Sequence, residues 1–172
     1  IFALDNGTVM DISSHPYEAV AGTSDNVILI DGEENSLAWV TESSPLTANI
    51  LTLDSVQNTL SVEVNASVDA AMDEQLLALT GTVVDYTNAS ITGITFDKYY
   101  LVAEVNLTAV TRLVMVNLDT GEQRILGDPL FPVAEPSIGH GHVAWQHQQF
   151  LNSLNPAEEN LDWDVSYHVI EE

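Results

Sequence analysis

Three histidines, His140, His142 and His147, lie within eight residues near the C-terminal end of the chain. A His-x-His spacing on a strand places two imidazole rings on one face, which suits zinc or copper. However, Gly141 favours a turn at this point, and strand alternation then directs His147 to the face opposite His142. We therefore expect structural or solvent-exposed histidines, with a metal site at His140 and His142 as the alternative.

Two acidic groups have the chemistry to hold a hard cation. Asp162 and Asp164 flank Trp163 and so share a strand face, while Asp31 and Glu33 lie at a glycine turn. Carboxylate oxygens are the ligands that Ca²⁺ prefers. Neither group follows the spacing of an EF-hand, and carboxylates are often adjacent by chance in an acidic chain. We expect no obligatory cofactor, with Ca²⁺ at these residues as the candidate to test.

Four Asn-x-Ser/Thr sequons begin at Asn6, Asn65, Asn88 and Asn106. Each lies in a polar stretch that is typical of a turn or a strand edge, where an attached glycan would face solvent. These four residues are the predicted glycosylation sites if the protein crosses a membrane in a glycosylating organism.

No catalytic residues can be identified from the sequence. It has no nucleophile elbow, zinc-protease motif, phosphate loop or dinucleotide fingerprint. A carbohydrate-active protein would need two converging carboxylates, and a sugar platform would use a tryptophan such as Trp39, Trp145 or Trp163. Tryptophans at strand positions are more often core residues, so carbohydrate binding or carbohydrate-active chemistry is the alternative function rather than the leading one.

Charge excludes several classes of partner. The 172 residues include 26 acidic and only 3 basic ones, for a formal net charge of −23. Such a chain has no basic patch to neutralise nucleic-acid phosphates, and it is equally unsuited to binding anionic membranes directly. A surface so poor in lysine suits salty or cation-rich surroundings, where its self-repulsion is screened. The absence of cysteine excludes disulfides and thiolate chemistry.

Short β-branched or alternating runs separated by turn residues dominate the sequence, which predicts an all-β chain. Only residues 69–79 have a helical alternative, with Ser67 as the N-cap and Gly81 as the end. Within that stretch, Leu76–Leu79 also fits a buried strand. The expected strands are 1–5, 8–12, 27–30, 36–40, 49–54, 59–64, 99–105, 112–118, 142–147 and 163–170.

An alanine recurs near the centre of four apolar runs, at Ala38, Ala78, Ala103 and Ala144. Two of the three intervals match the period of roughly 40–45 residues of a four-stranded propeller blade. We therefore expect residues 1–172 to form one propeller-like domain of about four antiparallel blades, or a fragment of a larger one. The interval of 25 residues between Ala78 and Ala103 does not fit, residues 65–97 match the pattern least well, and a β-sandwich is the alternative.

The C-terminal third carries more specific signals. A strand and turn at Val116–Glu122 are followed by Pro136–Gly139, by Val143–Gln146 and by Trp163–Tyr167. Together, residues 112–167 resemble the repeats of TolB-like β-propellers, which occur in bacterial periplasmic and archaeal cell-surface proteins. The resemblance implies a propeller-like array of blades and a place outside the cytoplasm.

These observations lead to one functional expectation. The chain begins at Ile1 without a signal-peptide pattern, so we expect a processed chain or a piece of a longer one. We expect a non-catalytic extracellular or cell-surface structural protein, such as a filament or surface-layer subunit that assembles through edge strands. Its expected partners are further copies of itself or the rest of a longer chain, with glycans as attached groups or ligands.

Overall fold

Strands dominate the computed structural model, so the all-β prediction is confirmed. The structure describes residues 2–5, 8–11, 27–33, 36–52, 58–128, 131–150 and 161–170. The strands are β1 (Phe2–Asp5), β2 (Thr8–Asp11), β3 (Val27–Glu33), β4 (Ser36–Thr41), β5 (Ser44–Thr52), β6 (Asn58–Glu63), β7 (Ser90–Phe96), β8 (Tyr100–Asn106), β9 (Thr111–Asn117), β10 (Gln123–Leu126), β11 (Val133–Gly139), β12 (His142–Phe150) and β13 (Leu161–Val169).

Within each sheet, every strand pairs antiparallel with the next strand in sequence, so the sheets are consecutive meanders. Strands β3 to β6 form the first sheet, β7 to β10 the second and β11 to β13 the third, while β1 and β2 form a separate hairpin. Short turns between consecutive strands are sufficient to build such sheets, because no strand crosses over another.

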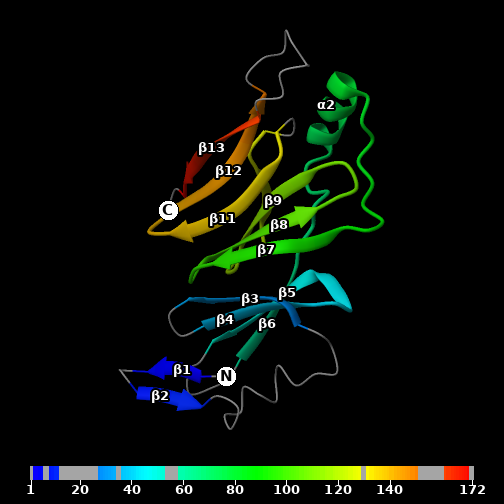
Figure 1. The fold of residues 1–172 in the computed structure, drawn as a ribbon. Coiled ribbons are helices and arrows are strands. Elements are labelled where there is room, and N and C mark those ends of the chain that lie inside the picture. The colour runs from blue at the N-terminus through cyan, green and yellow to red at the C-terminus, as the bar shows by residue number, and fades with distance from the viewer. Residues whose placement is uncertain are drawn as a thin grey trace.

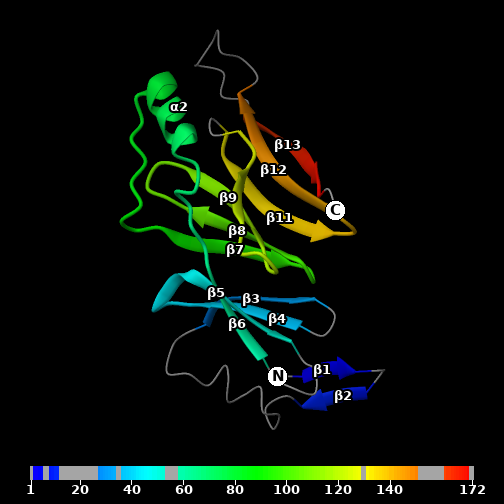
Figure 2. The same cartoon turned by 180° about the vertical axis from the view of Figure 1, so that it is seen from behind.

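The three sheets stack on one another with the second sheet in the middle (Figure 1). The view from behind shows the same order, with the β1–β2 hairpin beyond the first sheet (Figure 2). Within the described residues the stack is open rather than closed into a ring. The choice between a propeller-like array and a β-sandwich therefore stays a prediction.

Strand β8 shows how the sequence specifies the middle layer. Leu101, Ala103 and Val105 pack into the core shared with the first sheet, whereas Val102 packs into the core shared with the third. All four are fully buried. Alternate residues of a strand point to opposite faces, so a strand covered on both faces needs a nearly continuous apolar run.

One helix, α2 (Ala70–Thr80), lies between the first and second sheets in sequence. The prediction of Ser67 as its N-cap was wrong, because the Asp69 carboxylate accepts hydrogen bonds from two N–H groups of the first turn. Ser67 instead donates to the Asn65 side chain. Gly81 ends the helix, as predicted, in a left-handed conformation with φ of 74°. No helix in the described ranges is long and apolar enough to cross a membrane.

The helix explains the irregular alanine spacing. Ala38, Ala103 and Ala144 lie on β4, β8 and β12, the second strand of each sheet, whereas Ala78 lies in α2. The interpretation of residues 76–79 as a strand is therefore wrong. Helix α2 and its flanking segments are an insertion between two meanders, which is why segment 65–97 fits the repeat poorly.

Candidate functional site

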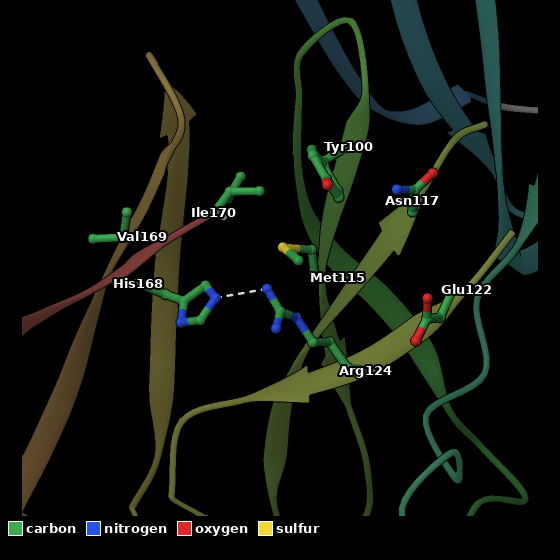
Figure 3. Close-up of a pocket in the computed structure, with 8 residues that line it drawn as sticks. All are labelled: Tyr100, Met115, Asn117, Glu122, Arg124, His168, Val169 and Ile170. Atoms are coloured by element: carbon green, nitrogen blue, oxygen red, sulfur yellow. Dashed lines mark hydrogen bonds between the residues drawn. The ribbon is translucent and has the colours of Figure 1, made fainter. Parts of the chain in front are cut away.

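A cleft of about 390 Å³ lies between the second and third sheets (Figure 3). The strand register builds its floor in two rows. Tyr100, Asn117 and Glu122 lie side by side across the second sheet, and Met115 and Arg124 form the next row. The opposite wall consists of three consecutive residues at the end of the third sheet: His168, Val169 and Ile170.

Strand alternation decides which side chains enter this cleft. Arg124 of β10 points into it, whereas the preceding Gln123 points to the other face of the sheet. There the Gln123 amide accepts from the Asn65 N–H and donates to the Glu63 carbonyl, both at 2.8 Å. Strand β10 thus binds the segment that follows the first sheet through Gln123 and lines the cleft through Arg124.

The cleft is lined by charged side chains of both signs, Arg124 and Glu122. Arg124 Nη2 lies 2.6 Å from His168 Nε2. Because a guanidinium can only donate, this contact needs a neutral His168 with its proton on Nδ1. In the described part of the chain no carboxylate forms an ion pair with Arg124, although Glu122 lines the same cleft. One guanidinium and one carboxylate therefore share the cleft without neutralising each other directly.

A second polar cluster surrounds Arg112, which is only 4% exposed. Its guanidinium pairs with the Asp73 carboxylate of α2 and donates to the Tyr86 hydroxyl at 2.7 Å and the Ala66 carbonyl at 2.8 Å. The Tyr86 hydroxyl in turn donates to Asp73 at 2.6 Å. All these partners belong to the protein, so the cluster fastens the inserted helix to β9 and has a structural role.

The Tyr86→Phe variant is expected to lower the free energy of unfolding by about 1–2 kcal/mol, because its hydroxyl bridges Arg112 and Asp73. Burial and the hydrogen bond to Asp73 raise the pKa of Tyr86 above its ordinary value. The unfolded chain therefore loses this proton first, and the bridge stabilises fully below about pH 10 but progressively less as pH rises through the folded-state pKa.

Urea unfolding of both proteins at about pH 8 and about pH 11 measures this contribution. The difference in unfolding free energy between wild type and Tyr86→Phe should shrink at the higher pH. A difference that is the same at both pH values would contradict the role of the phenol proton.

Three of the four sequons lie in the described residues. Asn65, Asn88 and Asn106 are all exposed, while Asn6 lies outside the described residues. At Asn65 the side-chain oxygen accepts from the N–H and the hydroxyl of Ser67, at 3.0 and 2.8 Å. Exposure makes all three accessible to a modifying enzyme, and glycosylation stays a prediction.

The acidic candidates for a metal site are far apart in the stack. Asp31 and Glu33 lie on β3 of the first sheet, whereas Asp164 lies opposite His147 in the third. The side chain of Asp162 lies outside the described residues. Where the structure describes side chains, it brings no group of three or more His, Asp or Glu residues together to hold a metal ion.

The histidines occupy a turn and the strand that follows it. His140 and Gly141 have positive φ values of 51° and 75° between β11 and β12. A ring nitrogen of His142 lies 2.9 Å from the His140 carbonyl, and His147 bonds to Ser166 at 3.0 Å. The strand register places His142 and His147 on opposite faces of β12, as strand alternation predicts.

The outer face of the third sheet carries an apolar stripe. Val165, Tyr167 and Val169 of β13 point away from the second sheet and are 73%, 71% and 49% exposed. His142, Ala144 and Gln146 of β12 lie directly opposite Val169, Tyr167 and Val165 on the same face. We call these six residues the stacking face.

The first sheet shows how the equivalent face is covered within the chain. Ala38–Trp39 and Ala144–Trp145 are oriented alike. Ala38 faces the second sheet and Trp39 faces the opposite way, just as Ala144 faces away from the second sheet and Trp145 faces toward it. Ile50 pairs with the first alanine and Tyr167 with the second, so they are counterparts. Ile50 is 6% exposed beneath the second sheet, whereas Tyr167 is 71% exposed.

Neither of these surfaces is predicted from the sequence. Tyr100, Asn117 and Arg124 come from different strands, and only the register places them in adjacent rows. For the stacking face a signal was present, because residues 165–169 alternate between apolar and polar side chains. Alternation predicts a strand with one apolar face, and it does not say whether the chain itself covers that face.

No protein-family model matches the sequence, and a search of curated proteins finds no match. Among solved structures, the fold is similar to the crystal structure of a chain described as a conserved lipoprotein from Clostridium novyi NT, with a TM-score of 0.52. The two chains are 10% identical, and the match covers 87% of this chain and 91% of the other. At this identity the likeness concerns the fold alone.

Proposed function

We propose that this chain is a cell-surface β-module that assembles by stacking its third sheet on a second copy of itself. The observation that carries the proposal is the stacking face. Tyr167 stands in solvent at the position where Ile50 is buried by a following sheet. Covering Val165, Tyr167 and Val169 would remove a contiguous apolar stripe from water, which is the dominant favourable contribution in most association.

The first sheet, on the side where the β1–β2 hairpin lies, offers a second apolar surface. Ile28 and Ile30 of β3 are 46% and 65% exposed. Ile30 pairs with Trp39, so it faces away from the second sheet. Contact between the stacking face of one copy and the Ile28–Ile30 surface of the next copy is heterologous, and such contacts build rings or filaments. The module would thus repeat between copies the stacking that it uses within one chain.

Charge agrees with this choice of surface. Copies that carry a formal net charge of −23 repel each other, so a contact must avoid carboxylates. No residue of the stacking face is a carboxylate, and the Glu135 carboxylate beside it accepts a hydrogen bond from the Gln146 amide at 2.6 Å. The remaining repulsion between copies is screened by salt, so assembly should strengthen as salt concentration rises.

The wider proposal is a propeller-like array at the cell surface. Three consecutive meanders have the strand order expected of blades, which supports the TolB-like resemblance of residues 112–167. The acidic composition, the exposed sequons and the description of the structural neighbour as a lipoprotein support the location. The exposed apolar stripe favours stacking of faces over the edge-strand pairing that the sequence suggested.

Light scattering at high salt tests the proposal with three variants. Tyr167→Asp should abolish the large assemblies of the wild type, and Ile30→Asp should do the same from the other end. An equimolar mixture of the two variants should form dimers, because each retains one intact end. Tyr99→Asp is the matched control, since Tyr99 is also exposed, at 48%, but lies outside the stacking face.

The outcomes separate the alternatives. A wild type that stays monomeric at high salt would refute self-assembly, and assemblies that survive Tyr167→Asp would refute the stacking face. If Ile30→Asp still dimerises while Tyr167→Asp does not, two stacking faces meet each other and the head-to-tail arrangement is wrong.

A further inference from the structure

We propose that the cleft between the second and third sheets binds a neutral, hydroxyl-rich saccharide. The cleft is lined by the polar row Tyr100, Asn117 and Glu122, by Arg124, and by the wall that contains His168. In Figure 3 the side chains of Tyr100, Asn117 and Arg124 surround that of Met115. Polar groups from separate strands thus converge around a small apolar centre, as they do in small-molecule sites.

The charge in the cleft selects a neutral ligand. Glu122 and the net charge of −23 disfavour an anion, whereas Arg124 disfavours a cation. A ligand without charge avoids both penalties and still uses both groups, because hydroxyls donate to a carboxylate and accept from a guanidinium. This combination of one acceptor and one strong donor fits the paired hydroxyls of a sugar ring.

Asn117 is already oriented for such a ligand. Its side-chain oxygen accepts from the N–H groups of Asp119 and Thr120, at 3.0 and 2.9 Å. These two bonds fix the amide, whose nitrogen has no hydrogen-bond partner among the described residues. Contact between Arg124 and His168 similarly restrains the guanidinium. Polar groups that are fixed before binding lose less conformational entropy when the ligand arrives.

The apolar part of the lining suits the carbon-bound face of a sugar. Tyr100 supplies an aromatic ring, and Met115 and Ile170 supply aliphatic surface. The volume of about 390 Å³ lies within the range of roughly 300–1,000 Å³ that is typical of small-molecule sites. Val169 is the one stacking-face residue that also borders the cleft, and the variants at Glu122 and Arg124 lie outside the stacking face, so this proposal and the proposed function are tested separately.

Isothermal titration calorimetry with neutral tetrasaccharides of glucose, mannose, galactose and N-acetylglucosamine tests the proposal on the whole chain. At least one probe should bind the wild type. Glu122→Ala and Arg124→Gln should each weaken that binding about tenfold or more, since each leaves ligand hydroxyls without a partner. Glu74→Ala, which removes an exposed carboxylate of the same charge from helix α2, should leave the affinity unchanged.

Circular dichroism establishes that each variant is folded before titration. The proposal is overturned if no probe binds at about 10 mM, or if binding is the same in wild type, Glu122→Ala and Arg124→Gln. It is also overturned if glucuronate or phosphate binds more tightly than the neutral probes and Glu122→Ala strengthens that binding, because the cleft would then be an anion site.

Discussion

Replacing Asp73 by alanine is expected to lower the free energy of unfolding by about 3 kcal/mol, the lower end of the usual effect of removing one partner from a buried ion pair, because Asp73 itself is 28% exposed. Arg112 is 4% exposed, and Asp73 is its carboxylate partner. Without Asp73 the guanidinium stays buried with no counter-charge, and the Tyr86 hydroxyl loses its acceptor. Taking a charge out of water without compensation is among the most destabilising changes available in a folded chain.

Urea denaturation measures the loss, and two further variants establish its cause. Glu74→Ala removes the next carboxylate of the same helix, which is exposed, and should change stability by no more than about 0.5 kcal/mol. A double variant with Arg112→Met and Asp73→Leu removes both charges and should cost less than Asp73→Ala alone. If Asp73→Ala and Glu74→Ala cost the same, the ion pair does not stabilise the fold.

The Asp73–Arg112 pair is an example of a contact that the sequence alone does not predict. In the sequence Asp73 stands between Asp69 and Glu74 in an acidic stretch, and Arg112 lies 39 residues further along the chain. Nothing local distinguishes a carboxylate that pairs with a buried guanidinium from one that faces solvent. The pairing depends on how the inserted helix lies against β9, which is a tertiary feature.

Local patterns succeeded where local physics decides the structure. Alternating and β-branched runs predicted most of the described strands, because the period of two is a property of the strand itself. They failed at residues 76–79, where a short apolar run fits both a strand and a helix. The caps at Asp69 and Gly81 decide in favour of the helix, and within it only Leu76 is buried.

The residues of the cleft and of the stacking face can be grouped only once the register of the strands is known. Tyr100, Asn117 and Glu122 are scattered over three segments, and they meet only because β8, β9 and β10 pair with particular offsets. A shift of one residue would turn each side chain to the other face of its sheet. Individual residues of such a site are therefore visible in the sequence, whereas their assembly is not.

Substitution of alanine for a leucine in the middle sheet should be comparably destabilising. Leu101 packs toward the first sheet and Leu113 toward the third, and both are fully buried. Each substitution should lower the free energy of unfolding by about 2–5 kcal/mol, because it removes apolar contacts and leaves a cavity between rigid layers. Leu60→Ala on β6 is the control; Leu60 is 46% exposed, so it should lose about 1 kcal/mol or less.

The two leucines together test whether the stack folds as a unit. If the second sheet joins both cores into one cooperative structure, Leu101→Ala and Leu113→Ala should each shift a single unfolding transition, followed by circular dichroism and by tryptophan fluorescence. Trp145 packs in the core that contains Leu113, whereas Leu101 belongs to the other core. Two separate transitions, with Leu113→Ala moving only one of them, would show that the third sheet unfolds independently. A single transition is the expected result, since β8 and β9 contribute side chains to both cores and neither core can lose them alone.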